Sequence, residues 1–450
     1  MVKSAFAMER NDNVLLSVTE QCDNVAGTAC PSEDAEHFEG VNFSVSAVLP
    51  AAGCGERMGV PTPKQFCDIL TRPLISYTMQ AFEKAQWIKD IVVVVARENT
   101  DFMKSVVCKY GHQRITLVEG GSTRHRSIFL GLKAFTETQS CLPSLSKPKV
   151  VIIHDAVRPF VEEDLLSRVA IAAHKSGAAG AIRPLVSTVI AASLSGFLDH
   201  SLERARYRAS EMPQAFLFDI IYEAYLCCSD SDFEYGTECL HLAQQYCNSS
   251  AKLIEGPSDL WKVTYKRDLY AAESLFKEML TEQVWIFAGT GHHTSYLGNL
   301  LQDAMQATVK TIKVVSTGIH GNLCLKDVLS VPCYNFVCIA TNSSSMQEVK
   351  WLTMSVVTAN ISTLYPVVVV TVHLDDNLGR TAGANIKEDP GGFRHLAKEL
   401  KPKNVLLYGL LIQGLKGSAQ MQESVAEASV IINALIKERS PALTGQLLVA

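Results

Sequence analysis

Short apolar runs rich in β-branched residues recur over the first 280 residues and alternate with segments of helical periodicity. A continuous apolar run predicts a strand buried on both faces, and the alternation predicts a mostly parallel sheet with helices on both sides. Helices are predicted at Leu74–Ala85 and Glu163–His174, and a further helix at Asp268–Leu280 would close this domain. The predicted strands are Phe43–Leu49, Ile91–Ala96, Ile115–Val118 and Val150–Ile153.

A second alternation of the same kind follows and ends in a long amphipathic helix, Ser418–Lys437. It predicts a second doubly wound α/β domain. At 450 residues the chain is too long for one ordinary core. We therefore predict a disordered tail over residues 1–42, a first domain over 43–281 and a second over 282–450. The strands of the second domain are expected at Val284–Ala288, Ile312–Ser316, Asn335–Ala340, Val367–Val372 and Val405–Tyr408.

The composition is that of a globular protein, with 47% hydrophobic and 19% charged residues and a net charge of −5. This balance argues against bulk nucleic-acid binding. The 13 cysteines are scattered without any C-x-x-C pair, which favours reduced thiols in a cytosolic protein. No apolar run approaches the roughly 18 residues of a membrane-spanning helix, so we expect no membrane association.

A glycine-rich turn directly follows the first predicted strand. The segment Leu49–Gly59 carries Arg57, and Pro63-Lys64-Gln65 comes shortly after it. Glycines let the backbone approach a phosphate closely, and such a turn exposes consecutive N–H groups. The spacing fits neither the dinucleotide nor the P-loop fingerprint. The turn indicates a nucleoside triphosphate ligand, and the alternative is an ordinary glycine turn with two solvated cations.

Four further motifs follow in order along the chain. With the glycine turn they resemble the sugar-phosphate nucleotidyltransferases, and more narrowly the cytidylyltransferases that include the methylerythritol-phosphate enzyme of isoprenoid synthesis. The resemblance covers about residues 43–280. It departs from the family pattern at Val157 in place of Ala, at Met212 in place of Thr, and at Gly236-Thr237-Glu238 in place of T-D-E. The motifs are Gly120–Ser127, His154–Pro159, Arg204 with Met212-Pro213-Gln214, and Trp261–Thr264.

The resemblance implies roles for individual residues. Arg57 and Lys64 would neutralise the charge that grows on the α-phosphate and the leaving group. Arg204 and Lys262 would hold the acceptor phosphate, with Asp155 and Arg158 beside it. Asp155 would bind either a substrate hydroxyl or a metal ion. The residues implied to bind the nucleotide are Pro50, Ala51, Ala52, Gly53, Gly55, Gly121, Ser122 and Ser127.

The implied reaction joins CTP to a polyol phosphate and releases pyrophosphate, with Mg²⁺ on the triphosphate oxygens. A phosphate monoester has a second pKa of about 6, so the acceptor needs no general base. Met212, the altered Gly236–Glu238 and the second domain favour ribitol 5-phosphate, for glycan building, over methylerythritol phosphate as acceptor. A non-catalytic nucleotide-binding scaffold is the alternative from another class. A homodimer is implied because the family's counterpart of Arg204 acts across a subunit interface.

The second domain resembles a degenerate short-chain dehydrogenase. Its first turn keeps Thr290-Gly291, but Ser295 and Leu297 replace the later glycines of the T-G-x-x-x-G-x-G pattern. Side chains there would obstruct the approach of a pyrophosphate. No Tyr-x-x-x-Lys follows residue 280. The sequence therefore favours a role in dimerisation, stability or ligand sensing over dehydrogenase activity.

Overall fold

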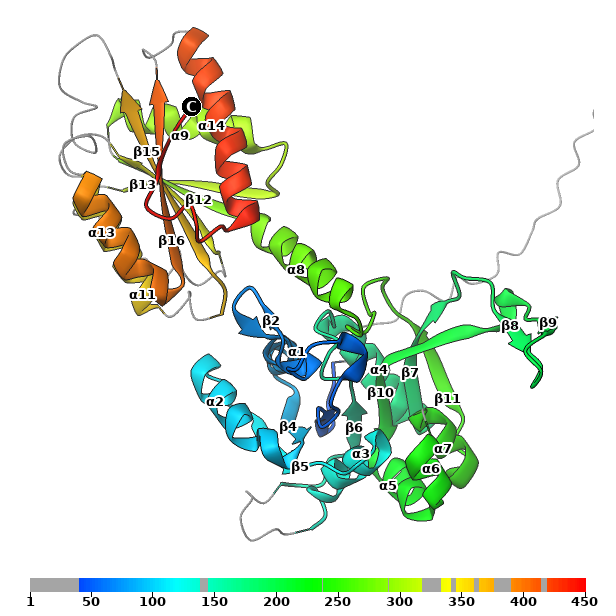
Figure 1. Cartoon of the computed structure of the whole chain (residues 1–450). Coiled ribbons are helices and arrows are strands. Elements are labelled where there is room, and N and C mark those ends of the chain that lie inside the picture. The colour runs from blue at the N-terminus through cyan, green and yellow to red at the C-terminus, as the bar shows by residue number, and fades with distance from the viewer. Residues whose placement is uncertain are drawn as a thin grey trace, which may run out of the picture. The chain divides into compact units, whose positions relative to one another are not determined.

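The structure is a computed structural model of the whole chain (Figure 1). It describes residues 40–137, 145–236, 238–289, 291–317, 333–340, 345–359, 364–375, 390–413 and 419–450. The chain divides into two compact units, Met1–Asn42 and Phe43–Ala450, and all elements given below belong to the second. The predicted disordered tail falls almost wholly outside the described residues and stays a prediction.

The first sheet has seven strands in the order β11-β7-β10-β6-β1-β4-β5. Strand β1 pairs in parallel with β4 and β6, and β10 alone runs antiparallel to its neighbours β6 and β7. The predicted mostly parallel sheet is confirmed. The strands are β1 (Val45–Pro50), β4 (Ile88–Val95), β5 (Ile115–Glu119), β6 (Val150–Ile153), β7 (Ala178–Pro184), β10 (Arg208–Leu217) and β11 (Ala251–Glu255).

The central strands of this sheet are buried on both faces. On β1, Val48 packs into a core with residues of α3, α5 and α7, while Ala47 and Leu49, which point to the opposite face, are equally inaccessible. This two-sided burial explains why the strands have continuous apolar sequences. The helices are α1 (Leu74–Lys84), α2 (Thr100–Tyr110), α3 (Arg124–Lys133), α4 (Glu163–Ser176), α5 (Phe218–Cys227), α6 (Asp230–Tyr235), α7 (Cys239–Cys247) and α8 (Lys266–Thr281).

A β-hairpin arm interrupts the chain between β7 and β10. It consists of β8 (Ile190–Ala192) and β9 (Leu198–Ser201), followed by the 3₁₀ turn η4 (Arg204–Arg206), and it projects from the rest of this domain in Figure 1. Apolar side chains on the arm are exposed, among them Leu194 and Phe197. Shorter elements are the β2 (Asp68–Ile69) and β3 (Arg72–Pro73) hairpin and the 3₁₀ turns η1 (Glu56–Met58), η2 (Lys64–Phe66) and η3 (Arg97–Asn99).

The second sheet has six strands in the order β13-β12-β14-β15-β16-β17, all paired in parallel. Helices α9 and α14 pack on one face, and α11 and α13 pack on the other. The predicted second doubly wound domain is confirmed. Its strands are β12 (Gln283–Gly289), β13 (Thr311–Thr317), β14 (Asn335–Ala340), β15 (Val367–Asp375), β16 (Val405–Gln413) and β17 (Leu447–Val449). Its helices are α9 (His292–Met305), α11 (Ser345–Thr358), α13 (Pro390–Leu400), the 3₁₀ turn η6 (Lys401–Lys403) and α14 (Ala419–Glu438).

The first turn of the second domain runs from β12 into α9. Gly291 is the N-cap of α9, and the Thr294 hydroxyl lies 2.6 Å from the Gly289 carbonyl and 2.7 Å from the Gly291 carbonyl. Leu297, which replaces a glycine of the dehydrogenase pattern, is buried in the core. Thr290 and Ser418, which the sequence analysis named, lie outside the described residues.

Within the described parts of the chain, no helix has the length and apolar content that crossing a bilayer requires.

Candidate active site

An open pocket lies where the carboxyl ends of β1 and β6 meet the start of α3. Such an edge is where ligands bind in open α/β sheets. The lining residues come from segments far apart in the sequence. Ten of the residues predicted to form the site line it: Pro50, Ala51, Ala52, Gly53, Lys64, Gly121, Ser122, Ser127, Asp155 and Lys262.

The glycine turn after β1 brings Lys64 to the pocket. Gly55 has a φ of +75°, a backbone angle that residues with a side chain rarely adopt. A Cβ at this position would lie 3.0 Å from the Lys64 backbone nitrogen. Only glycine lets these two segments pack so closely. The turn therefore positions Lys64 at the pocket, although Gly55 itself does not line it.

The second turn, at Gly120-Gly121, packs directly against the first. A Cβ on Gly120 would come within 2.5 Å of the Ala52 Cβ, so the contact requires glycine. Ser127 closes the turn, because its hydroxyl lies 3.2 Å from both the amide nitrogen and the carbonyl oxygen of Gly121. Thr123 is the N-cap of α3 and accepts from the Arg126 N–H.

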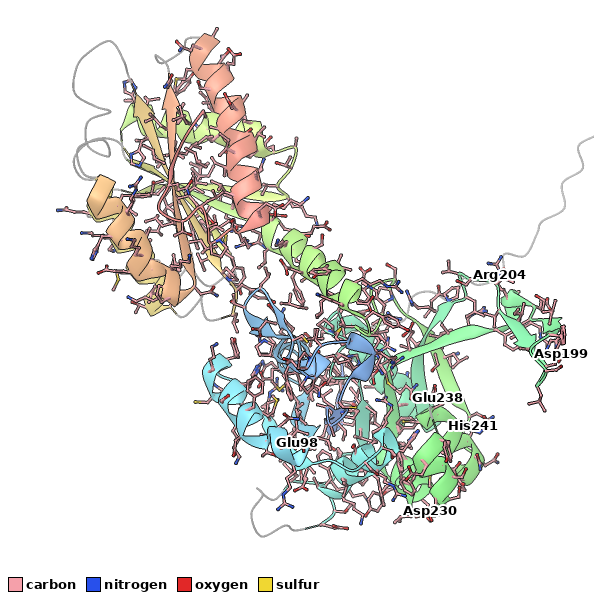
Figure 2. The ribbon with its side chains drawn as sticks, viewed as in Figure 1. Glu98, Asp199, Arg204, Asp230, Glu238 and His241 are labelled. Carbon is pink, nitrogen blue, oxygen red and sulfur yellow. The ribbon has the colours of Figure 1, made fainter. Side chains whose placement is uncertain are left out.

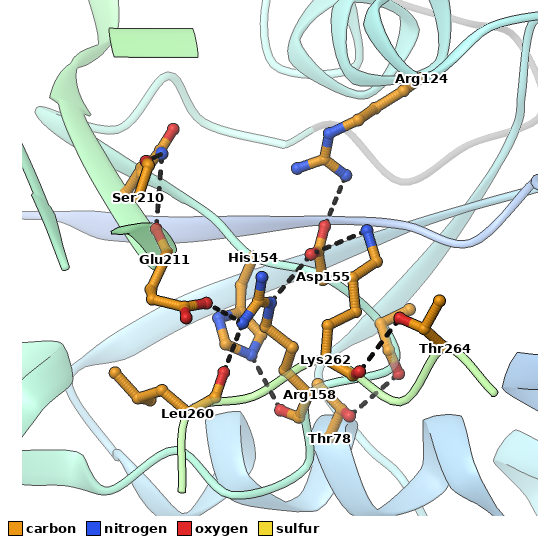
Figure 3. Close-up of polar contacts among 12 residues, drawn as sticks. Thr78, Arg124, His154, Asp155, Arg158, Ser210, Glu211, Leu260, Lys262 and Thr264 are labelled. Carbon is orange, nitrogen blue, oxygen red and sulfur yellow. Dashed lines mark hydrogen bonds and ion pairs between the residues drawn. The ribbon is translucent and has the colours of Figure 1, made fainter. Parts of the chain in front are cut away.

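Asp155 is the centre of a cluster of ion pairs (Figure 3). Its Oδ1 lies 2.5 Å from Arg124 Nη1, and its Oδ2 lies 3.1 Å from Lys262 Nζ and 2.9 Å from Arg158 Nε. Burial alone would raise the pKa of the Asp155 carboxyl, yet the three cations hold that pKa well below its usual range. The carboxylate is therefore ionised at any working pH and holds three basic side chains in place.

The loop that carries Asp155 is tied down by buried polar contacts. Thr78 donates to the Ala156 carbonyl at 3.0 Å, and the Val263 N–H donates to the Val157 carbonyl at 3.1 Å. His154 Nε2 lies 2.9 Å from the Arg158 carbonyl, which can only accept, so this nitrogen carries a proton. Burial lowers the pKa of His154 to about 4, so the ring is neutral. These bonds fix the distance between Asp155 and the Lys262 segment.

Arg158 lies behind the pocket and does not line it. Its guanidinium bonds to Asp155, to the Glu211 carboxylate and to the Leu260 carbonyl, and it is buried (Figure 3). Glu211 also pairs with Arg183 at 3.1 Å. Arg158 thus positions Asp155 in this structure, and the sequence analysis had placed it among the residues that contact the acceptor.

Positive charge exceeds negative charge around the pocket. The pKa of Lys64 is lowered to about 8, chiefly by burial and also by the nearby charges of Lys262, Arg57 and Arg124, while the Asp155 carboxylate opposes this shift. Burial also lowers the pKa of Lys262, with Asp155 opposing. Cations that depress each other's pKa favour the arrival of an anion, because an anion relieves their repulsion. The pocket is suited to a polyanionic ligand.

Two predicted catalytic arginines do not line this pocket. Arg57 lies in η1 and is exposed, close enough to influence the charge of Lys64. Arg204 lies at the base of the arm, where it donates to the Val186 carbonyl at 2.8 Å (Figure 2). The structure brings Lys64, Asp155 and Lys262 together and leaves Arg204 elsewhere in the same chain.

The sequence analysis gave Asp155 either a substrate hydroxyl or a metal ion as its ligand. Cations lie close to both of its oxygens, although Oδ1 has no partner in hydrogen-bond geometry, and the residues that the structure describes contain no group of three His, Cys, Asp or Glu side chains that could hold a metal ion. The role of Asp155 as a metal ligand stays a prediction.

Sequence reasoning did not assign a site role to Arg124 or Gln65, both of which line the pocket. A signal for Arg124 was present, since it is the arginine of the G-G-x-x-R turn and stands at the start of a predicted helix. Gln65 directly follows Lys64, and its role depends on bonds to a distant turn that the local pattern does not reveal.

Comparisons with known proteins agree with this geometry. Residues 45–278 match the family model of 2-C-methyl-D-erythritol 4-phosphate cytidylyltransferase, and residues 282–429 match that of the D-ribitol-5-phosphate cytidylyltransferase C-terminal domain. The human D-ribitol-5-phosphate cytidylyltransferase is 56% identical over 409 residues, which are 90% of each chain. The chain belongs to the D-ribitol-5-phosphate cytidylyltransferase family.

Other relatives match the chain over different lengths. The Xenopus tropicalis D-ribitol-5-phosphate cytidylyltransferase is 55% identical over 90% of this chain and 97% of its own. The 2-C-methyl-D-erythritol 4-phosphate cytidylyltransferase of Syntrophus aciditrophicus (strain SB) is 35% identical over 52% of this chain and 96% of its own. The predicted resemblance to cytidylyltransferases is confirmed. The second domain is shared with the D-ribitol-5-phosphate cytidylyltransferases.

Proposed function

We propose that the protein transfers CMP from CTP to D-ribitol 5-phosphate and so produces CDP-ribitol and pyrophosphate. An oxygen of the acceptor phosphate attacks the α-phosphorus while the bond to the pyrophosphate oxygen breaks. The supporting observation is the pocket that Lys64 lines together with Lys262 and Arg124, which both pair with Asp155, within a chain of this family. No proton has to be removed, because the acceptor phosphate is already largely dianionic above its second pKa of about 6.

We assign each group of pocket residues a role from its position. The two glycine turns would bind the nucleotide, and Lys64 would meet the charge that develops on the leaving pyrophosphate, with Arg57 beside it. Lys262 would hold the acceptor phosphate in line for attack. Such a reaction depends on positioning and on stabilising negative charge more than on acid–base chemistry.

We also propose Mg²⁺ as a cofactor. Since Asp155 is fully ion-paired, the ion would be held by triphosphate oxygens and would supply further positive charge to the leaving group.

The proposed homodimer rests on the position of Arg204. This side chain does not line the pocket of its own chain, and it sits on an arm whose apolar side chains are exposed. An arm that packs on a second copy would bury those side chains and could deliver Arg204 to the partner's pocket.

For location and pathway, we propose the cytosol and the supply of CDP-ribitol for protein O-glycan synthesis of the dystroglycan type. The cytosol is supported by thiols that have not formed disulfides, which is usual in a reducing compartment. They are Cys67, Cys108, Cys227, Cys228, Cys239, Cys247 and Cys333.

Methylerythritol phosphate is the second candidate acceptor, because the first domain alone matches that family model. The test compares pyrophosphate release from CTP and Mg²⁺ with ribitol 5-phosphate, methylerythritol phosphate, other pentose phosphates or no acceptor, and identifies the products by mass. CDP-ribitol formation with little product from methylerythritol phosphate is expected. Turnover only with methylerythritol phosphate, or CTP binding without any turnover, would contradict the proposal.

A further inference from the structure

Gln65 joins the two segments that form the phosphate side of the pocket. Its side chain is buried, and it lies in η2 directly after Lys64. The amide nitrogen Nε2 donates to the Ala51 carbonyl at 2.7 Å and to the Gly53 carbonyl at 2.9 Å. Both partners can only accept, so the orientation of the amide is determined and both of its hydrogens are used.

These two bonds determine which way the peptide groups of the glycine turn face. In a trans peptide the C=O of one residue and the N–H of the next point in opposite directions. Because the Ala51 carbonyl turns toward Gln65, the Ala52 N–H turns away from it. The bond to Gly53 likewise withdraws a second carbonyl oxygen. The peptide group that follows Gly53 is the more dependent on this bond, because glycine tolerates many conformations, whereas Ala51 is also held by its N–H bond to the Val94 carbonyl.

We propose that Gln65 is a positioning residue for triphosphate binding. It holds two carbonyl oxygens of the glycine turn away from the phosphates, so that the turn presents N–H donors to them, and it fixes the adjacent Lys64 against the same turn. The inference rests on the proposed use of CTP. A free carbonyl that faces a phosphate would repel it. The loss of Gln65 therefore weakens the binding of the triphosphate and does not change the recognition of the nucleoside.

Two substitutions test this role. Gln65→Met keeps the size of the side chain and removes its donors. Gln65→Glu keeps its shape and places a carboxylate against two carbonyl oxygens. The matched control is Gln80→Met, which removes another side-chain amide that is bonded inside the protein, to Arg72 at 2.7 Å, and that does not line the pocket.

The probes are CTP, inorganic pyrophosphate, cytidine and ribitol 5-phosphate, used with the full-length protein, and the melting temperature is measured for every variant. Both Gln65 variants should raise the KM for CTP and the inhibition constant of pyrophosphate about tenfold or more, as expected for one lost hydrogen bond to a charged group. The inhibition constant of cytidine and the KM for ribitol 5-phosphate should stay within about twofold. Gln80→Met should lower the melting temperature and leave all four constants unchanged.

An equal loss of affinity for cytidine and for pyrophosphate would overturn the proposal and assign Gln65 a purely structural role, as would unchanged affinity for both. Failure of the wild-type protein to bind CTP would overturn the proposed function together with this inference. Normal wild-type turnover with unaffected Gln65 variants would overturn the inference alone.

Discussion

The two domains contain the same kind of turn, in which the first strand of a parallel sheet leads toward a helix, but only the first turn opens into the described pocket. In the first domain, Gly55 and Gly120 allow two turns and Lys64 to pack closely around an open space. In the second, the Thr294 hydroxyl bonds to two turn carbonyls and Leu297 enters the core. The same architecture thus supports a charged pocket in one domain and a packed helix start in the other, so function must be argued from the site.

The largest effect should come from removing the lysine that the first turn positions. Lys64→Ala should lower the turnover number by about 10²–10³-fold, because a charge aimed at the transition state is lost in a partly buried site. Arg57→Ala should act in the same direction. Both variants should keep a wild-type circular dichroism spectrum, and near-wild-type turnover in both would contradict their roles.

Asp155→Asn should affect both activity and folding. The substitution leaves Arg124, Lys262 and Arg158 without their shared counter-charge, and breaking a buried pair in this way costs on the order of 3–5 kcal/mol. Urea unfolding measures the loss. A variant as stable as the wild type would show that the cations do not depend on this carboxylate.

Arg204→Ala should weaken only the binding of the acceptor. If a partner's arm delivers this arginine, the KM for ribitol 5-phosphate should rise about tenfold, the cost of one charged hydrogen bond, with the KM for CTP unchanged. Steady-state kinetics with each substrate varied in turn provides the test. An unchanged acceptor KM would remove Arg204 from the site.

The pH dependence follows from the low pKa of Lys64. With a pKa of about 8, this side chain loses its charge as the pH rises through that value, so kcat/KM for CTP should decline above about pH 8. In the Lys64→Arg variant the side chain at this position stays charged above pH 8, so the decline should shift to higher pH. A profile that is identical in the two proteins would mean that another group causes the decline.

The smallest effect should come from the turn in the second domain. Thr294→Val removes the hydroxyl that bonds to the Gly289 and Gly291 carbonyls and should cost about 1 kcal/mol of stability. Turnover measured below the melting temperature should not change. A large loss of turnover at intact stability would indicate that this turn also serves the reaction.

Local patterns predicted much of this molecule. The apolar runs identified β1, β4 and β6 because both faces of these strands are buried, and they identified the less buried β5 as well. The glycine turns identified most of the pocket. The antiparallel strand β10 was not predicted, since Pro213 and the polar residues at its start interrupt the pattern of a central strand.

The parts of the site that depend on tertiary contacts were missed or misplaced. Gln65 acts on carbonyls 12 and 14 residues earlier in the chain, and Arg158 turned out to lie beneath Asp155, bonded to Glu211 on a distant strand. No periodicity encodes such pairings, because they depend on how separate segments pack.

The central claim is that the charged pocket of the first domain performs the transfer. Its most direct test is the rate of CDP-ribitol formation from CTP and ribitol 5-phosphate, followed by mass, for the wild type and for a Lys64→Ala/Lys262→Ala double variant. We predict rapid product formation by the wild type and essentially none by a folded double variant. Comparable rates in the two proteins, or no CDP-ribitol from either, would contradict the account.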